Sequence, residues 1–161
     1  MSIPRYFWAA AFWAFLAGCS RAPSTDGADR AQWIERAREA HLQAAQASDP
    51  AQLDRARESL SSFVEQPAPR QIAPQLVQSM LQDSYFNLAQ LALKTDRSAE
   101  ALAWADRGLA FEARNDLFYA NLLLARGQAL EKLNRESEAA ESYHRALLIN
   151  ESLLHEIGEM P

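Results

Sequence analysis

The amino-acid sequence predicts an all-α protein, a solenoid of about three antiparallel helix pairs closed by a short capping helix at the C-terminus. From about residue 30 onward the chain is dominated by Ala, Leu, Gln, Glu and Arg, which are good helix formers. Valine and isoleucine are too sparse there to build a sheet. Apolar residues recur at helical spacing, and the last two predicted helix pairs repeat after 38 residues.

The first eighteen residues have the layout of a secretory signal peptide. Arg5 precedes an apolar run, residues 6 to 16, that is too short to span a bilayer. The small residues Ala17 and Gly18 then precede Cys19. We interpret residues 1–18 as a leader that is removed; the alternative is a short buried helix that happens to end in a cysteine.

A tether and one folded domain are predicted after the leader. Residues 20 to 29 include Ser, Pro, Thr, Gly and Asp and almost no bulky apolar residue, so residues 19–29 are predicted to form a flexible tether. Residues 30–158 are long enough for one modest domain. Because Cys19 is the only cysteine, no internal disulfide can form, and the fold must be held by packing.

The first two helices are predicted on either side of Ser48-Asp49-Pro50, where Asp49 can cap a helix and Pro50 suits a first turn. The second must end before Pro67, because proline disfavours helix in the residue before it. The apolar or small positions of the two helices are Trp33, Ala37, Ala40, His41 and Ala44, then Leu53, Ala56, Leu60, Phe63 and Val64.

Four further helical segments are predicted. Pro74 can open the third, a turn at residues 95–98 separates it from the fourth, and Asn115-Asp116 separates the fourth from the fifth. The fifth ends at Asn134, a residue type that tolerates left-handed backbone. The sixth is predicted from about residue 136 to 150. After it, Leu153, Leu154 and Ile157 form a short apolar stripe that could cover the end of the stack.

Helix pairs in the second half of the chain repeat in sequence. Ala101-Leu102 aligns with Ala139-Ala140, and Gly108-Leu109 aligns with Ala146-Leu147. The spacing of small and large residues resembles the tetratricopeptide repeat, which implies a right-handed solenoid whose helices nest where small side chains lie at the crossings. The residues that match this packing role are Ala89, Ala101, Gly108, Gly127, Ala139, Tyr143 and Ala146.

The sequence also departs from the repeat pattern. Arg126 replaces the leucine expected before the glycine, and Ala113 and Glu151 stand where the family usually has proline. The first pair fits poorly and would be a degenerate repeat or a capping hairpin. The alternative to a repeat protein is an unrelated alanine-rich helical bundle.

The residues Leu16-Ala17-Gly18-Cys19 resemble the lipobox of bacterial lipoproteins. The resemblance implies that Cys19 becomes a lipidated N-terminus with three acyl chains, which suffices for stable membrane attachment. Ser20 follows where lipoproteins kept in the inner membrane often have aspartate. The resemblance therefore favours an anchor in the outer membrane, with the domain facing the periplasm.

The sequence shows no motif for catalysis, a cofactor or a metal. His41, His144 and His155 lie far apart, and the sequence has no GxSxG elbow, phosphate-binding glycine loop or dinucleotide fingerprint. Glu136, Glu138 and Glu141 are typical of a solvated helix face. The formal net charge of -5 gives no basic footprint for nucleic acid. We therefore predict a protein that is not an enzyme.

A partner-binding groove is implied by the repeat resemblance, because the first helix of each pair lines a concave surface in that family. The residues carried over to this role are Arg38, His41, Asp83, Phe86, Gln90, Asn121, Leu124 and Gln128. The predicted function is a membrane-anchored periplasmic scaffold or adaptor that binds an envelope protein or peptide, such as a component of a pilus, secretion or outer-membrane assembly. The alternative is a regulatory module that recruits a cell-wall hydrolase or binds peptidoglycan.

Overall fold

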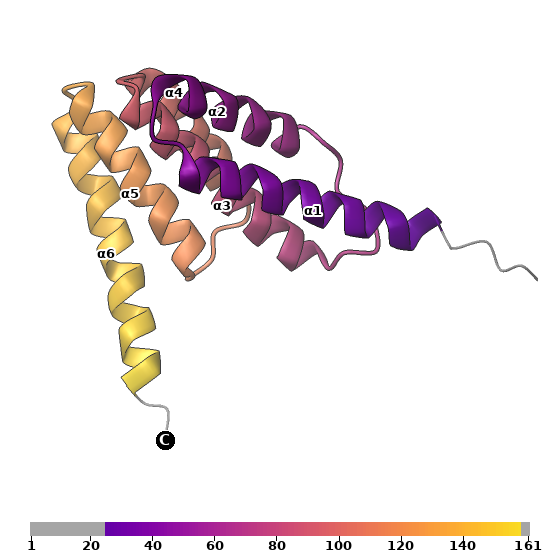
Figure 1. Cartoon of the computed structure of the whole chain (residues 1–161). Helices are drawn as coiled ribbons and strands as arrows, with labels where there is room; N and C mark the ends of the chain where they lie inside the picture. Colours follow the sequence, from indigo (N-terminus) through magenta and orange to yellow (C-terminus); the bar gives the residue numbers. More distant parts are fainter. Residues whose placement is uncertain (1–24, 159–161) are drawn as a thin grey trace, which may run out of the picture.

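A computed structural model describes residues 25 to 158, which form six α-helices and no β-strand (Figure 1). The predicted all-α class is thereby confirmed for this part of the chain. The predictions for residues 1–18 and for Cys19 lie outside the described residues. The helices are α1 (Thr25–Gln46), α2 (Pro50–Val64), α3 (Pro74–Lys94), α4 (Ser98–Leu109), α5 (Leu117–Lys132) and α6 (Glu136–Gly158).

Local signals set most of the helix boundaries. The Asp49 carboxylate caps α2 by accepting from the backbone N–H of Gln52 at 2.9 Å. Asp116 caps α5 in the same way, accepting from the N–H of Tyr119 at 3.0 Å. The turn after α5 has Asn134 in the left-handed region with φ 59°, a conformation that asparagine adopts more readily than most residues.

Two boundaries differ from the sequence prediction. Helix α1 begins at Thr25, so residues 25 to 29 of the predicted tether are helical. The predicted short C-terminal capping helix is wrong, because α6 continues without a break from Glu136 to Gly158. The physical reason is that no proline or glycine interrupts the chain between Asn150 and Gly158. Leu154 and Ile157 are exposed on α6 and do not cover the end of the helices.

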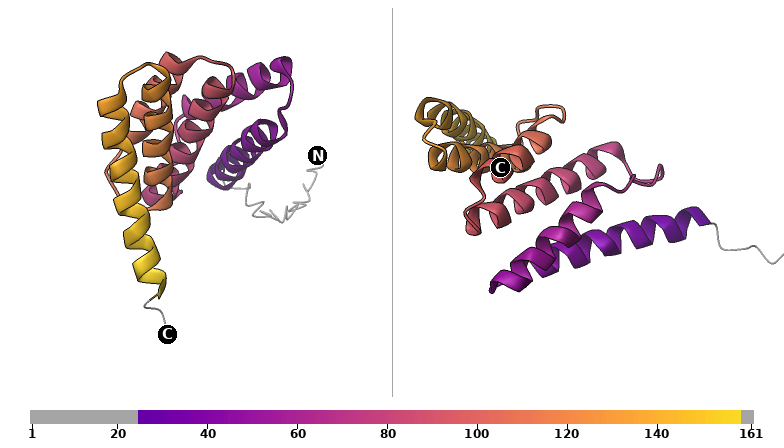
Figure 2. Two further views of the ribbon diagram at one scale, coloured as in Figure 1. Left: turned by 90° about the vertical axis from the view of Figure 1, so that its left-hand side faces the viewer. Right: turned by 90° about the horizontal axis from the view of Figure 1, so that it is seen from above.

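Aromatic and small residues join successive helices along the chain. Trp33, in the first half of α1, packs on Phe63 near the end of α2, with ring centroids 4.9 Å apart. Tyr85 of α3 lies against Gly108 near the end of α4. In the same way Gly127, late in α5, lies against a tyrosine early in α6. Figure 2 shows α5 and α6 side by side, with α6 extending beyond α5.

The core is built largely from alanine. Its largest fully buried side chains include Leu60, Phe63, Leu88, Leu122 and Leu130. Thirteen buried alanines lie among these larger side chains, and side chains no larger than a methyl group let helix backbones approach closely. The buried alanines are Ala37, Ala40, Ala44, Ala56, Ala89, Ala92, Ala101, Ala105, Ala120, Ala125, Ala129, Ala139 and Ala146.

Two of the predicted packing residues are glycines, Gly108 and Gly127, and both let neighbouring side chains lie close to the helix backbone. A Cβ atom on Gly127 would lie 2.4 Å from Cε1 of Tyr143, and a Cβ on Gly108 would lie 2.6 Å from Cδ2 of Leu122. Both distances are too short for carbon atoms, so a side chain at either position requires a neighbour to move. Of the seven predicted packing residues, Ala89, Ala101, Gly108, Gly127, Ala139 and Ala146 are buried, and Tyr143 is half-buried.

Tyr143 covers Gly127, and its hydroxyl donates to Oε2 of Glu131 at 2.8 Å. Burial of the ring, together with the hydrogen bond to the Glu131 carboxylate, raises the pKa of Tyr143 to about 12. An unfolded tyrosine titrates at about pH 10, so the stability from neutral Tyr143 is present below that pH and is lost as pH rises through the folded pKa.

Tyr143→Phe tests this shift. In a spectroscopic titration that follows tyrosinate formation, the unsubstituted chain should show a transition at about pH 12 that is absent in Tyr143→Phe. A titration curve that is the same in shape with and without Tyr143 would contradict this.

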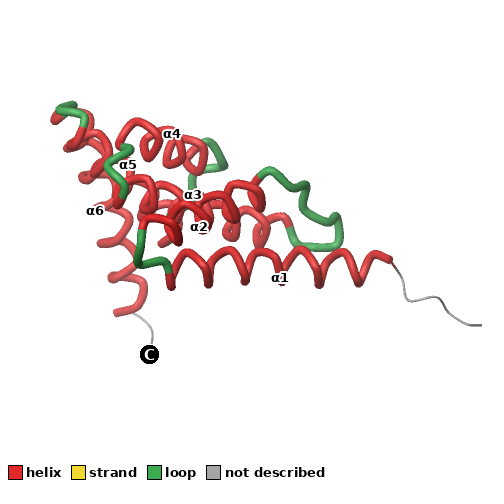
Figure 3. The backbone as a smooth tube through the Cα atoms, turned by 45° about the horizontal axis from the view of Figure 1, so that its top comes forward, coloured by secondary structure: helices red, strands yellow, loops and turns green. Residues whose placement is uncertain are grey.

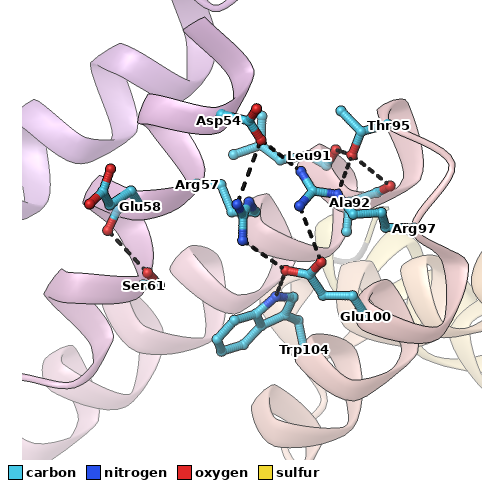
Figure 4. A network of polar contacts seen from close by, with 10 residues as sticks. All are labelled: Asp54, Arg57, Glu58, Ser61, Leu91, Ala92, Thr95, Arg97, Glu100 and Trp104. Atoms are coloured by element: carbon cyan, nitrogen blue, oxygen red, sulfur yellow. Dashed lines mark hydrogen bonds and ion pairs between the residues drawn. The ribbon is translucent and has the colours of Figure 1, made fainter. Parts of the chain in front are cut away.

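Helices α2 and α4 are bridged by side chains alone, since no pair of their Cα atoms lies within 8 Å. Figure 4 shows the bridge: Arg97 Nη2 lies 2.9 Å from Oδ1 of Asp54, and Arg57 Nη1 lies 3.4 Å from Oε1 of Glu100. The indole N–H of Trp104 donates to the same Glu100 oxygen at 3.2 Å. Long side chains thus connect α2 to the start of α4.

Candidate binding groove

A hollow of about 610 Å³ lies between α1 and α3, with one residue from the start of α5 in its wall. Its floor and walls are mainly apolar, yet Ile34, Leu42 and Leu76 are 40%, 46% and 51% exposed, so the hollow is an open groove. Figure 3 shows the backbone of α1 and α3 and the loops that connect each of them to α2. The lining residues are Ile34, Ala37, Arg38, His41, Leu42, Leu76, Ser79, Met80, Asp83 and Phe118.

Helical spacing explains how these side chains come to face one another. On α1, Ile34, Arg38 and Leu42 follow at intervals of four residues and share one face, next to the face that packs on α2. On α3, Leu76, Met80 and Asp83 follow at intervals of four and three residues. Two helix faces, each with apolar and charged side chains, therefore line the groove.

His41 makes the polar connection between the two walls. Its Nδ1 lies 3.0 Å from Oδ2 of Asp83, and its Nε2 lies 2.7 Å from Oγ of Ser84. Because an ionised carboxylate only accepts hydrogen bonds, Nδ1 is the donor to Asp83. The Ser84 hydroxyl is also 2.8 Å from the carbonyl oxygen of Met80, to which it donates. These contacts hold α1 against α3 at the edge of the groove.

The order Ser84, His41, Asp83 is that of a hydrolase triad, in which the imidazole lies between a hydroxyl and a carboxylate. A nucleophilic serine must reach the carbonyl carbon of a substrate. Ser84 is 0% exposed, and its hydroxyl also bonds to the Met80 carbonyl oxygen one helical turn earlier. In this structure the three residues therefore connect two helices and present no nucleophile to the groove.

The predicted groove residues fall into three sets. Arg38, His41 and Asp83 lie together in the groove. Gln90 of α3 donates from Nε2 to Oε1 of Gln128 on α5 at 3.0 Å, which places this pair farther along α3, beyond the groove.

The remaining three predicted residues lie on α3 and α5, outside the groove lining. Phe86 is half-buried and packs against the cluster of buried alanines shared by α3, α4 and α5. Leu124 packs against Tyr119, Leu123 and Ala146, between α5 and α6. Asn121 is half-buried on α5 and does not line the groove.

The apolar walls of the groove were not among the predicted site residues. Ile34 directly follows the buried Trp33, and Leu42 directly follows His41, so both stand beside the buried face of α1. Large apolar residues at such positions indicate a second apolar face, and this signal is visible in the sequence. Leu76, Met80 and Phe118 recur with other apolar residues at helical spacing, which is also the pattern of helix packing, so their part in the groove depends on the distance between α1 and α3.

Each charged group at the rim has a polar partner. The guanidinium of Arg38 pairs with the Glu35 carboxylate one turn earlier on α1. This hydrogen bonding lowers the pKa of Glu35 and raises the pKa of Arg38. Asp83 and His41 are in direct contact at the edge of the groove. A ligand would therefore meet an apolar floor with fixed polar groups on both walls.

Comparison with known proteins identifies no relative: no family model, curated protein or solved structure matches the chain. Within residues 25–158, no group of three or more His, Cys, Asp or Glu side chains could hold a metal ion. None of the helices described there is both long and apolar enough to cross a bilayer. The groove and the N-terminal sequence are the features from which a function can be inferred.

Proposed function

We propose that this protein is a membrane-anchored periplasmic scaffold or adaptor lipoprotein whose groove binds a segment of another envelope protein. The observation that carries the proposal is the open apolar groove between α1 and α3, combined with the lipobox-like residues 16–19. Apolar side chains left exposed in one hollow are typical of an interaction site. Lipid on Cys19 would keep that site at the membrane.

The proposed architecture is a right-handed solenoid of three antiparallel helix pairs similar to tetratricopeptide repeats. Contacts between equivalent residues of successive pairs support it. The hydrogen bonds His41–Ser84, Arg57–Glu100 and Arg97–Asp54 each join residues 43 positions apart. The hydrogen bond between Gln90 and Gln128 joins residues 38 positions apart. Nearly constant separations are expected where each unit stacks on the next.

In this architecture α1, α3 and α5 are the first helices of the three pairs, and the groove lies on them. Its shape favours a partner helix that presents apolar side chains at intervals of three and four residues. Such side chains would cover Ile34, Leu42 and Leu76, while polar groups of the ligand meet Arg38, His41 and Asp83. Apolar burial would supply affinity, and the polar groups would fix the direction of the bound segment.

The anchor would hold the groove near the membrane. Because α1 begins at Thr25, only residues 20 to 24 separate it from Cys19. Even a fully extended chain of this length reaches only about 20 Å. The domain would therefore recruit its partner close to the bilayer surface, which suits an assembly factor for an envelope complex.

Leu42→Glu tests the proposal in the full chain. A charge on the apolar wall of the groove should lower the amount of partner that co-purifies from detergent extract at least about tenfold, because an unpaired charge would be buried in the interface. Leu42 is 46% exposed, so the free energy of unfolding should change little. A photo-cross-linker at position 42 should capture the same envelope protein as one at position 76.

Leu148→Glu is the matched control for this experiment, since Leu148 is 51% exposed on α6 and does not line the groove. It should leave partner recovery unchanged. The proposal fails if the two glutamate variants recover equal amounts, or if positions 42 and 76 capture no common envelope protein. Capture of a cell-wall hydrolase at both positions would instead support the regulatory alternative.

A further inference from the structure

A smaller hollow, of about 270 Å³, lies where the segment between α4 and α5 meets the start of α5 and the middle of α6. We call it the α5–α6 hollow, and it shares no lining residue with the groove between α1 and α3. Sites that hold drug-sized molecules have about 300–1,000 Å³, so this hollow suits a smaller ligand. Its lining includes Arg114, Asn115, Tyr119, Arg145, Leu148 and Ile149.

Arg145 of α6 brings a positive charge to the α5–α6 hollow. Its Nη2 donates to the hydroxyl oxygen of Tyr119 at 3.3 Å, and it takes part in none of the ion pairs within residues 25–158. Tyr119 is 6% exposed, so its ring is fixed in place. Because the Tyr119 oxygen accepts from Arg145, the hydroxyl proton can be donated to a ligand.

Arg114 brings a second guanidinium, which Asp116 holds in place. Oδ1 of Asp116 accepts from the backbone N–H of Tyr119 at 3.0 Å, and Oδ2 lies 3.3 Å from Nε of Arg114. This carboxylate is therefore shared between a helix cap and one guanidinium. No acidic side chain of the described chain lines the hollow itself. Two guanidiniums against one carboxylate leave one positive charge, which favours a ligand with a single negative charge.

The α6 side of the hollow is apolar. Leu148 is 51% exposed, and Ile149 is half-buried. Ala146, earlier on the same helix, packs against Tyr119 and Leu123, which holds α6 against α5. A ligand that fills the hollow would therefore place its charge on the guanidiniums and an apolar group against the two α6 side chains. An inorganic anion, which is polar on all sides, would leave this apolar wall uncovered.

We propose that the α5–α6 hollow binds a small apolar carboxylate. The carboxylate lies on Arg145, Arg114 and the Tyr119 hydroxyl, and the apolar group lies on Leu148 and Ile149. A guanidinium presents parallel N–H groups that match the two oxygens of a carboxylate. A free carboxylic acid and the last residue of a peptide share this chemistry. The site uses neither the groove nor Cys19, so it does not depend on the proposed function.

Isocaproate and isocaproamide test the requirement for charge, because they carry the same branched chain and differ in having a carboxylate or a neutral amide. Each is titrated into the full chain in detergent and followed by NMR. Isocaproate should shift the backbone amide resonances of residues 113–119 and 145–149 with a saturable Kd on the order of 1 mM, as expected for a ligand with so few atoms. Isocaproamide should bind at least about tenfold more weakly.

Arg145→Gln should raise the Kd for isocaproate at least about tenfold, because it removes the charge that has no acidic partner. Tyr119→Phe keeps the ring and should raise the Kd about fivefold, the effect of one hydrogen bond. Arg55→Gln is the matched control: it makes the same change on α2, outside the hollow, and should leave the Kd within about twofold. Leu42→Glu should have no effect either, so a failure of the groove proposal would be seen separately.

The proposal is overturned if isocaproate and isocaproamide bind equally, if Arg145→Gln and Arg55→Gln act equally, or if the shifted resonances lie outside the two segments. A short peptide ending in leucine distinguishes the two sources of the carboxylate. Tighter binding than isocaproate, lost when the terminus is amidated, would support the site and identify a peptide end as its ligand. An affinity no better than that of isocaproate would support the site and identify a free acid.

Discussion

Phe63→Ala is expected to lower the free energy of unfolding by about 3–5 kcal/mol, the range for removing a buried aromatic side chain. Phe63 is 2% exposed and packs on Trp33 between α1 and α2. The neighbouring residues that face this space include Ala37, Ala40 and Ala56, whose methyl groups cannot extend into the cavity that would be left. The loss should therefore lie at the upper end of what a single core substitution produces.

Urea denaturation followed by helical circular dichroism measures this effect. Phe111→Ala makes the same change at a half-buried ring and should cost clearly less. Phe63→Leu keeps most of the volume and should cost under about 1.5 kcal/mol, which keeps the comparison measurable if the alanine variant is largely unfolded. A loss below about 1 kcal/mol for Phe63→Ala would show that α1 and α2 do not pack as described.

Cys19→Ser is expected to abolish lipid attachment, and with it removal of the leader and retention in the outer membrane. In the proposed lipoprotein, the thiol sulfur forms the thioether that carries the lipid, and a serine hydroxyl is far less nucleophilic than a thiolate. Without acylation the leader stays attached, so the intact mass of the variant should include residues 1–18 and no fatty acid. Mass spectrometry and fractionation of outer-membrane and soluble material measure both effects.

Ser20→Ala provides the control, because it changes the residue after the cysteine without removing the thiol. The Ser20→Ala protein should still be acylated and lie in the membrane fraction, and its mass should be lower than that of the unsubstituted protein by one oxygen atom. A Cys19→Ser protein with the same processing and membrane retention as the unsubstituted chain would contradict the anchor proposal.

Helix boundaries were predictable where a local signal exists. Asp49 and Pro50 start α2, Pro74 starts α3 and Asp116 starts α5, and each acts through its own backbone or side-chain chemistry. The extension of α6 was not predictable in this way. Asn150 can end a helix but does not force it to end, and whether the helix continues depends on the whole segment up to Gly158.

The candidate site was predictable in its helices but not in its contacts. The repeat resemblance implied a groove role for Arg38, His41 and Asp83, and these three side chains line the hollow between α1 and α3. The contact of His41 with Ser84 depends on how α1 and α3 are positioned, since 43 residues separate the two. The burial of Phe86 also depends on how the helices are positioned. Its ring packs against the small alanine side chains of α4 and α5.

The alanine-rich core limits how the sequence of this protein can vary over evolution. A side chain larger than methyl at Ala101, Ala125 or Ala146 would push two helix backbones apart, so these positions accept almost no exchange. Ile34, Leu42 and Leu76, by contrast, are partly exposed and can change without moving a helix. Related chains could therefore acquire new binding partners by substitutions in the groove while their helix-crossing residues stay small.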